Sequence, residues 1–261
     1  ILDEEPLITT KINPIRKAKF EGKIEFENVW FAYEEENWIL KDVSFTIEPG
    51  MSAAFVGATG AGKSSILNLI GRYYDIQKGT IKIDGIDIRD LHTDDLRRAI
   101  GQVQQDVFIF TGDIKTNIRL FDEKVTDTEI KEASRYVNAD SFIEKLPRKY
   151  DEPVMERGAT LSSGERQLLS FARTLAYDPS ILVLDEATAN IDTETEKLIQ
   201  NALEKLMKGR TTIMVAHRLS TIQHADKIFV MHKGEIIESG THQELLNLDG
   251  MYKKLYDLQL Q

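Results

Sequence analysis

The chain has 261 residues, enough for one large domain or two small ones, and its 41% hydrophobic and 29% charged residues are ordinary for a globular protein. The net charge of −10 argues against nucleic acid as a partner. The sequence contains no cysteine, which excludes disulfides and thiolate chemistry, and no apolar run approaches the roughly 18 residues that a membrane helix needs.

The N-terminal part of the chain contains short runs in which apolar and polar side chains alternate, and such runs predict strands. Strands are expected over residues 24–33, 42–50 and 52–57, the last nearly all apolar as in a parallel sheet. A helix is expected over 63–75, and the turn sequence Asp84-Gly85 predicts a hairpin.

From about residue 113 the pattern becomes helical. Thr126 and Glu129 have the spacing of a capping box at a helix start. A later helix, over 162–179, places leucines on one face and ends at Pro179. Beyond it strands and helices alternate, with strands expected over 180–186, 211–217 and 227–240, and helices over 192–207, 241–248 and 250–259.

Residues 57–65 read GATGAGKSS, which matches the phosphate-binding pattern G-x-x-x-x-G-K-[ST] between a buried strand and a helix. In such a P-loop, backbone N–H groups surround the phosphate oxygens, and the dipole of the following helix adds positive potential at the same place. Lys63 is expected to reach the β- and γ-phosphates and to act in catalysis, and the Ser64 hydroxyl is expected to bind Mg²⁺. The residues expected to bind ATP here are Gly57, Ala58, Thr59, Gly60, Ala61, Gly62, Lys63, Ser64 and Ser65.

The sequence ILVLDEAT places two acidic residues at the carboxyl end of a buried strand, where ligands bind in open α/β sheets. Asp185 is expected to bind Mg²⁺, directly or through water. Glu186 is expected to accept a proton from the attacking water or to orient it. With the P-loop, these features predict an α/β fold of the P-loop NTPase (RecA-like) type: a parallel sheet core, an antiparallel β edge and a helical subdomain inserted over about residues 106–178.

Five further short elements occur along the chain. In chain order they are FAY with Tyr33, QQDVFIF with Gln105, LSSGE at 161–165, ATANID ending at Asp192, and VAHRLST with His217. Because of them, residues 23–261 resemble the nucleotide-binding domain of an ABC transporter. The resemblance implies that Tyr33 stacks on adenine and that Gln105 binds Mg²⁺ and senses the γ-phosphate. It also implies that Asp192 belongs to the nucleotide site and that His217 contacts the γ-phosphate as a catalytic residue.

The sequence MERG at 155–158 resembles an element of exporters, in which this domain follows six membrane helices on the same polypeptide. Residues 1–22, which begin at Ile1 and show little periodicity, are therefore expected to be a linker from a missing transmembrane domain. The fragment itself is expected to be soluble and to work at the cytoplasmic face of the cell (inner) membrane, within an integral membrane transporter. The apolar run 107–110 is expected either to dock the membrane domain or to be a buried strand.

In this family two domains pair head to tail, and each ATP is bound by the P-loop of one and the signature, Leu-Ser-Gly-Gly-Gln, of the other. Ser162 and Gly164 match it and are expected to bind the partner's nucleotide, whereas Ser163 and Glu165 replace glycine and glutamine. At about 8 Å and an effective dielectric constant of about 20, each pair of unit charges between Glu165 and phosphate costs about 2 kcal/mol. We therefore expect a heterodimer whose other chain has the consensus signature and a weak catalytic acid, unless a cation such as Arg166 offsets this charge.

Three other functions stay open at this point. A homodimeric exporter would use the altered signature as it stands. A non-transport ABC ATPase of repair or translation would usually carry two cassettes or very long inserts, and this chain has one cassette and a short insert. A P-loop kinase would transfer phosphate to a small acceptor, but it would not need the signature or the histidine.

Overall fold

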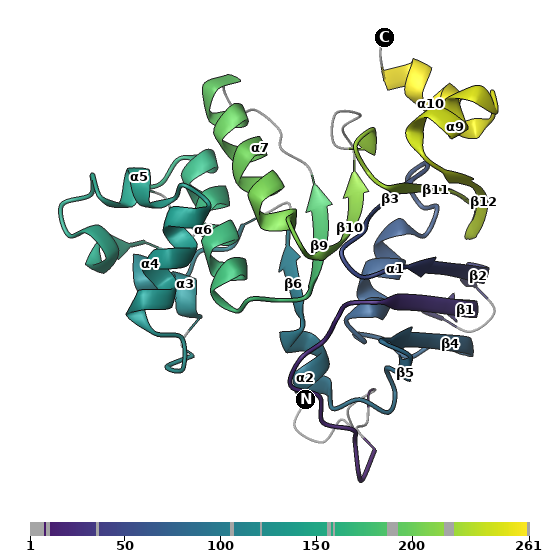
Figure 1. The fold of residues 1–261 in the computed structure, drawn as a ribbon, viewed down its shortest axis with the longest axis horizontal. Helices are drawn as coiled ribbons and strands as arrows, with labels where there is room; N and C mark the ends of the chain where they lie inside the picture. Colours follow the sequence, from purple (N-terminus) through teal and green to yellow (C-terminus); the bar gives the residue numbers. More distant parts are fainter. Residues whose placement is uncertain are drawn as a thin grey trace. The chain divides into compact units, whose positions relative to one another are not determined.

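The computed structural model describes residues 8, 11–34, 37–104, 107–120, 122–155, 158, 160–186, 193–216 and 222–259. The chain divides into two units (Figure 1). The first comprises Ile1–Ile100, Ser180–Glu186 and Arg210–Gln261, and the second comprises Gly101–Pro179 and Ala187–Gly209.

Four strands of the first unit form an antiparallel sheet with the order β2-β1-β4-β5. Their bounds are β1 (Ile24–Ala32), β2 (Trp38–Ile47), β4 (Lys78–Ile83) and β5 (Ile86–Asp87). The predicted hairpin is confirmed, because Asp84 and Gly85 have positive φ angles of 51° and 76° between β4 and β5. β2 begins earlier than predicted, since Trp38 pairs with Ala32 at the end of β1.

The larger sheet has the strand order β12-β11-β3-β10-β9-β6. Its strands are β3 (Ser52–Val56), β6 (Ile100–Val103), β9 (Ile181–Glu186), β10 (Thr211–Ala216), β11 (Lys227–His232) and β12 (Glu235–Gly240). Strands β11, β3, β10 and β9 run parallel, and β12 pairs antiparallel with β11. The boundary between the units falls within β6, after Ile100. The predicted fold class, a parallel sheet with an antiparallel β edge, is confirmed.

Aromatic side chains from both sheets meet in the core of the first unit. Phe45 of β2 packs against Phe55 of β3 and Phe229 of β11, with ring centroids 5.2 Å apart in each pair. Helix α1 (Lys63–Ile70) adds Ile66, which is fully buried in the same cluster. Burial of this apolar surface holds the helix that follows the P-loop in a fixed place.

The helix α1 is shorter than the predicted helix over 63–75. It ends at Gly71, and Arg72 has a φ of 47°, a left-handed conformation that an α-helix cannot continue through. A short helix that was not predicted, α2 (Thr93–Arg98), follows the antiparallel sheet. The two predicted C-terminal helices are confirmed as α9 (His242–Asn247) and α10 (Met251–Gln259).

Helices dominate the second unit. They are α3 (Ile114–Arg119), α4 (Asp127–Tyr136), α5 (Asp140–Ile143), the 3-10 helix η1 (Lys149–Asp151), α6 (Ser163–Ala176) and α7 (Thr193–Met207), with the short strands β7 (Gly112–Asp113) and β8 (Pro153–Val154). Helices α3, α4 and α7 all pack against α6. The predicted capping box is confirmed, because Thr126 and Glu129 each accept a hydrogen bond from the backbone N–H of the other.

None of the helices in the described part of the chain has the length and apolar character needed to span a bilayer.

Candidate functional site

Three neighbouring parallel strands end at one edge of the larger sheet. Strand β10 lies between the other two, and its Val215 pairs with Phe55 of β3 on one side and with Asp185 of β9 on the other. Two strand spacings place the Cα atoms of Phe55 and Asp185 about 10 Å apart. Since the P-loop begins directly after Val56, it emerges beside Asp185 at the carboxyl ends of the strands, where open α/β sheets bind ligands.

The P-loop, 57–65, requires glycine at its first position. Gly57 has a φ of 151°, and a Cβ there would overlap the carbonyl oxygen of Met231 on β11. Gly60 has a φ of 81°, but a Cβ there would meet no atom within 4 Å. The loop is therefore packed tightly at its start and open to solvent beside Gly60, which leaves room for a ligand there.

Lys63 places a buried cation inside this loop. Its Nζ donates hydrogen bonds to the carbonyl oxygens of Gly57 at 2.8 Å and Ala58 at 3.0 Å, and the residue is only 8% exposed. Burial lowers the pKa of Lys63, and the negative charge of Asp185 opposes that change. Asp185 therefore lies close enough to Lys63 to interact with it, and a bound triphosphate would stabilise the charged form of the lysine further.

The first turn of α1 carries groups that fit phosphate and Mg²⁺. The N-cap residue Gly62 offers no side-chain cap, which leaves the first N–H groups of the helix to an anion. Ser64 is exposed, and its hydroxyl, the Asp185 carboxylate and phosphate oxygens are the hard oxygen ligands that Mg²⁺ prefers. No group of three His, Cys, Asp or Glu side chains among the described residues could hold a metal ion. A Mg²⁺ ion here would therefore depend on phosphate oxygens for part of its coordination.

Tyr33 follows β1 directly and touches the helix that follows the P-loop. Its hydroxyl shares a hydrogen bond with Oγ of Ser65 at 3.2 Å and accepts another from Nδ2 of Asn68 at 3.3 Å. Tyr33 is 47% exposed, so part of its ring is accessible to a ligand. The structure thus brings together Tyr33 and the last residue of the P-loop, which are expected to bind the base and the phosphates of one nucleotide.

The altered signature begins α6 with a capping box. The backbone N–H of Glu165 donates to Oγ of Ser162 at 3.2 Å, and the backbone N–H of Ser162 donates to the Glu165 carboxylate at 2.8 Å. Arg166 donates to the carbonyl oxygen of Leu161 at 2.6 Å. The Glu165 carboxylate therefore lies at the positive end of the α6 dipole, where a phosphate of a partner's nucleotide would otherwise be favoured.

Gly164, another signature residue that matches the consensus, is buried. A Cβ at this position would overlap Cγ2 of Thr195 on α7. The glycine therefore has a packing role between α6 and α7 in addition to any contact with nucleotide.

Three expected site residues, Gln105, Asp192 and His217, lie outside the described residues. Glu186 is the last residue of β9, where its backbone pairs in register with Ala216 of β10. The roles assigned to the four side chains stay predictions.

Sequence reasoning missed the residues that hold Tyr33. Asn68 could have been found, because its i,i+3 spacing from Ser65 places both on one face of α1. Tyr74 and Gln77, which also contact the end of β1, gave no such signal, since their contacts are with residues far away in the sequence.

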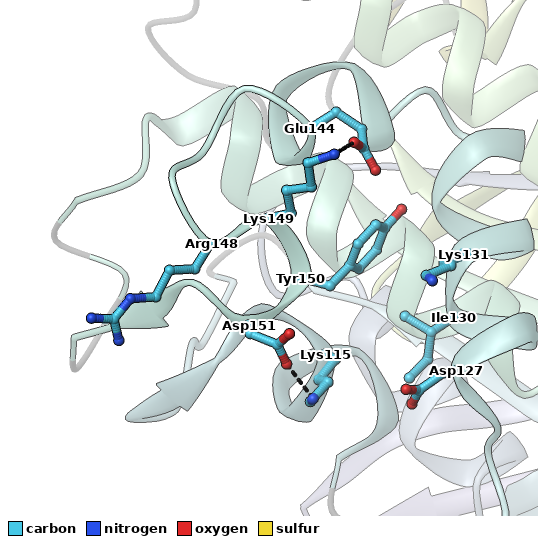
Figure 2. A pocket seen from close by; sticks show the side chains of 9 residues that line it. All are labelled: Lys115, Asp127, Ile130, Lys131, Glu144, Arg148, Lys149, Tyr150 and Asp151. Atoms are coloured by element: carbon cyan, nitrogen blue, oxygen red, sulfur yellow. Dashed lines mark hydrogen bonds and ion pairs between the residues drawn. The ribbon is translucent and has the colours of Figure 1, made fainter.

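A separate cavity of about 270 Å³ lies in the second unit (Figure 2). Residues of α3, α4 and η1 line it, and Lys149 forms an ion pair with Glu144 at 2.7 Å while Lys115 pairs with Asp151. None of the expected site residues lines this cavity.

The sequence profile described as ABC transporter matches residues 40–189, more than half of the chain. The chain belongs to the ABC transporter family. It is 54% identical over 243 residues to a probable multidrug resistance ABC transporter ATP-binding/permease protein of Bacillus subtilis, covering 93% of this chain and 36% of the relative. It is also 54% identical over 259 residues to a putative ABC transporter ATP-binding protein of Streptococcus pneumoniae, covering 99% of this chain and 44% of the relative.

Among solved structures, a bacterial Atm1-family ABC exporter with ATP bound is similar to this chain, with a TM-score of 0.91 and 39% identity over 99% of this chain and 45% of that one. The expected P-loop fold and the assignment as a nucleotide-binding ATP hydrolase domain of this family are confirmed. The chain spans less than half the length of these relatives.

Proposed function

We propose that this chain is the motor domain of an exporter and that it hydrolyses ATP in a head-to-tail dimer with a second ABC nucleotide-binding domain. The observation that carries the proposal is that the P-loop with Lys63 and the acidic residue Asp185 follow neighbouring parallel strands to the same edge of the sheet, in a chain similar to relatives named as multidrug exporters. Those relatives are described as ATP-binding/permease proteins. We therefore place a transmembrane domain on the same polypeptide and this domain at the cytoplasmic face of the cell membrane.

The P-loop residues would bind the triphosphate first. Lys63 exchanges its bonds to the carbonyl oxygens of Gly57 and Ala58 for bonds to the β- and γ-phosphates. Ser64 and Asp185, with Gln105, would hold Mg²⁺, which neutralises charge on the phosphate oxygens when it is bound. The N–H groups at the start of α1 fix the position of the phosphates.

Hydrolysis then needs a base beside the γ-phosphate. Glu186 accepts a proton from the attacking water as the water oxygen bonds to phosphorus, and the bond to the leaving ADP oxygen breaks to release inorganic phosphate. His217 and Asp192 complete this side of the site, and Tyr33 stacks on adenine.

Two exposed phenylalanines support a membrane-domain partner. Phe108 and Phe110 are 48% and 40% exposed, and their rings pack edge to face with centroids 4.8 Å apart. Such a pair offers apolar surface for a helix of the membrane domain to cover.

The altered signature supports a heterodimer. The Glu165 carboxylate occupies the N-terminus of α6, and its charge opposes binding of a partner's phosphate to Ser162. The site that contains this chain's own P-loop is free of this repulsion, because the partner supplies the signature there. One site would then hydrolyse ATP and the other would mainly hold it.

A reversed partner made from the same chain tests this arrangement. The variant Ser163→Gly, Glu165→Gln, Glu186→Gln carries the consensus signature and no catalytic base. Mixed with the unchanged chain, it should give phosphate release well above that of either protein alone, because only the mixed dimer combines Glu186 with a consensus signature. Equal turnover by the unchanged chain on its own would overturn the heterodimer and favour a homodimeric exporter.

A further inference from the structure

Every described contact that holds the Tyr33 side chain, other than that of Phe31 on β1, comes from α1 or from the segment that follows it. Ser65 and Asn68, both on α1, hydrogen-bond to its hydroxyl at 3.2 Å and 3.3 Å. Tyr74 packs against its ring edge to face, with centroids 4.9 Å apart and an interplanar angle of 85°. The helix that begins at the P-loop thus also builds the surroundings of the residue proposed to stack on the base.

Gln77 fixes the backbone on which Tyr33 stands. Its side-chain amide donates to the carbonyl oxygen of Ala32 at 2.9 Å and accepts from the backbone N–H of Ala32 at 3.0 Å. The backbone N–H of Gln77 donates to the carbonyl oxygen of Trp30 at 3.2 Å. On the side away from β2, the side chain of Gln77 therefore bonds to Ala32 in place of a neighbouring strand. Tyr33 is the next residue along the chain.

Tyr74 limits the rotation of the Tyr33 ring. The ring of Phe31, a residue that is only 1% exposed, packs edge to face against the Tyr33 ring, with centroids 4.7 Å apart and an interplanar angle of 80°. The Tyr74 ring also packs against the Tyr33 ring, at nearly a right angle. Tyr74 is 39% exposed and also packs against Phe31, with ring centroids 5.8 Å apart, so the three rings form one cluster. A base that stacks on Tyr33 would meet a ring whose orientation is already set, which reduces the ordering cost of binding.

We propose that Tyr74 and Gln77 are positioning residues for nucleotide binding, and that they set the orientation of Tyr33 relative to the P-loop. This inference rests on the proposed role of Tyr33 as the base-stacking residue. The segment after α1 then influences the affinity for the base, whereas the P-loop determines the affinity for the phosphates.

Binding of two ligands separates these roles. ATP carries a base and inorganic tripolyphosphate carries none, so a change in Tyr33 orientation alters binding of the first alone. We expect Tyr74→Leu and Gln77→Glu to weaken ATP binding about three- to tenfold, a part of the full stacking contribution, and to leave tripolyphosphate binding unchanged. Glutamate at position 77 keeps an acceptor for the N–H of Ala32 but cannot donate to its carbonyl oxygen.

Two further variants serve as controls. Tyr74→Phe keeps the ring and should bind ATP as the unchanged chain does. Tyr73→Leu removes a neighbouring exposed ring that packs under the guanidinium of Arg97, 5.1 Å from its centroid, and should also leave ATP binding unchanged.

The variant Tyr33→Leu distinguishes failure of this inference from failure of the proposed role. Normal ATP binding by Tyr33→Leu would show that Tyr33 does not stack on the base, and both ideas would fall. Weak ATP binding by Tyr33→Leu, with normal binding by Tyr74→Leu and Gln77→Glu, would overturn the positioning role alone. Equal losses for ATP and tripolyphosphate would also overturn it, because they would indicate damage to the P-loop.

Discussion

The ammonium group of Lys63 donates a hydrogen bond to the carbonyl oxygen of Gly57, 2.8 Å away, and so closes the P-loop on itself. The same ammonium group also binds the carbonyl oxygen of Ala58. These two hydrogen bonds hold the loop in a defined shape, and its glycines Gly57 and Gly60 contribute to that shape in different ways.

Alanine substitutions at these two glycines should affect different properties: Gly57→Ala mainly the stability of the protein, and Gly60→Ala mainly its affinity for ATP. Gly57→Ala places a Cβ on the carbonyl oxygen of Met231 and should destabilise the protein by about 3 kcal/mol or more. Gly60→Ala meets open space, so its φ of 81° should cost only about 1 kcal/mol, while the new methyl group obstructs a phosphate. Urea unfolding and ATP titration check both variants, and a Gly60→Ala protein with normal ATP affinity would contradict the assigned phosphate position.

Gly164→Ala should destabilise the second unit by about 1–3 kcal/mol, because its Cβ would overlap the side chain of Thr195. Thr195→Ala removes the clashing methyl group and should restore most of that loss in the double variant. A double-mutant cycle by urea unfolding measures the coupling between the two positions. Independent, additive effects would show that the glycine is not needed for contact between α6 and α7.

Glu165→Gln should strengthen ATP-driven association of two domains. Glutamine can keep the capping box with Ser162, so stability should change by less than about 0.5 kcal/mol. Removal of the charge should favour pairing by about 2 kcal/mol, or about thirtyfold, for each nucleotide site of the dimer. Sedimentation with ATP, in a Glu186→Gln background that blocks turnover, provides the measurement.

The control for that variant is Glu165→Ala, which loses the carboxylate and with it the hydrogen bond from the backbone N–H of Ser162, while the backbone N–H of residue 165 still donates to Oγ of Ser162. It should also remove the repulsion, but at a cost of about 1 kcal/mol in stability. If Glu165→Gln and the parent associate equally, the charge of Glu165 does not govern pairing.

Asp84 ties the N-terminal segment to the hairpin turn. Its carboxylate accepts hydrogen bonds from the backbone N–H groups of Glu21, Gly22 and Lys23 at 2.8–2.9 Å and lies 3.0 Å from Nζ of Lys17. Burial alone would raise the pKa of Asp84, but the hydrogen bonds from Lys17 and the backbone outweigh it, so the pKa lies below its usual 3.8.

The sign of the resulting pH dependence follows from this lowered pKa. Asp84 contributes its stabilisation in full above pH 3.8 and loses it as the pH falls through its lower value in the folded protein. Asp84→Asn, which tolerates the left-handed φ of 51°, should cost about 2–4 kcal/mol at pH 7. In urea unfolding from pH 7 to pH 2, the difference between the two proteins should shrink below pH 3.8. A constant difference would contradict the account.

Local signals in the sequence were sufficient for much of the site. The P-loop pattern and the acidic end of β9 follow from short motifs and strand order, so Lys63 and Asp185 could be expected near one another. The hairpin at Asp84-Gly85 follows from turn chemistry alone. Each of these features depends on residues adjacent in the chain or on the general geometry of parallel sheets.

Features that depend on distant contacts could not be predicted. The end of α1 at Gly71 was missed, although glycine often follows the last turn of a helix, because the residues up to 75 keep a helical pattern. The pairing of Gln77 with the backbone of Ala32 and the packing of Gly164 against Thr195 arise only once separate elements meet.

The most direct test of the whole account compares the unchanged chain with Glu186→Gln, each mixed with the reversed partner described above, by ATP titration and phosphate release on the same samples. The two mixtures should bind ATP with affinities within about twofold of each other, and phosphate release should fall by about 10²–10⁴ for Glu186→Gln. Unchanged phosphate release from the Glu186→Gln mixture, or absence of ATP binding in both mixtures, would contradict the assignment of the P-loop and Glu186.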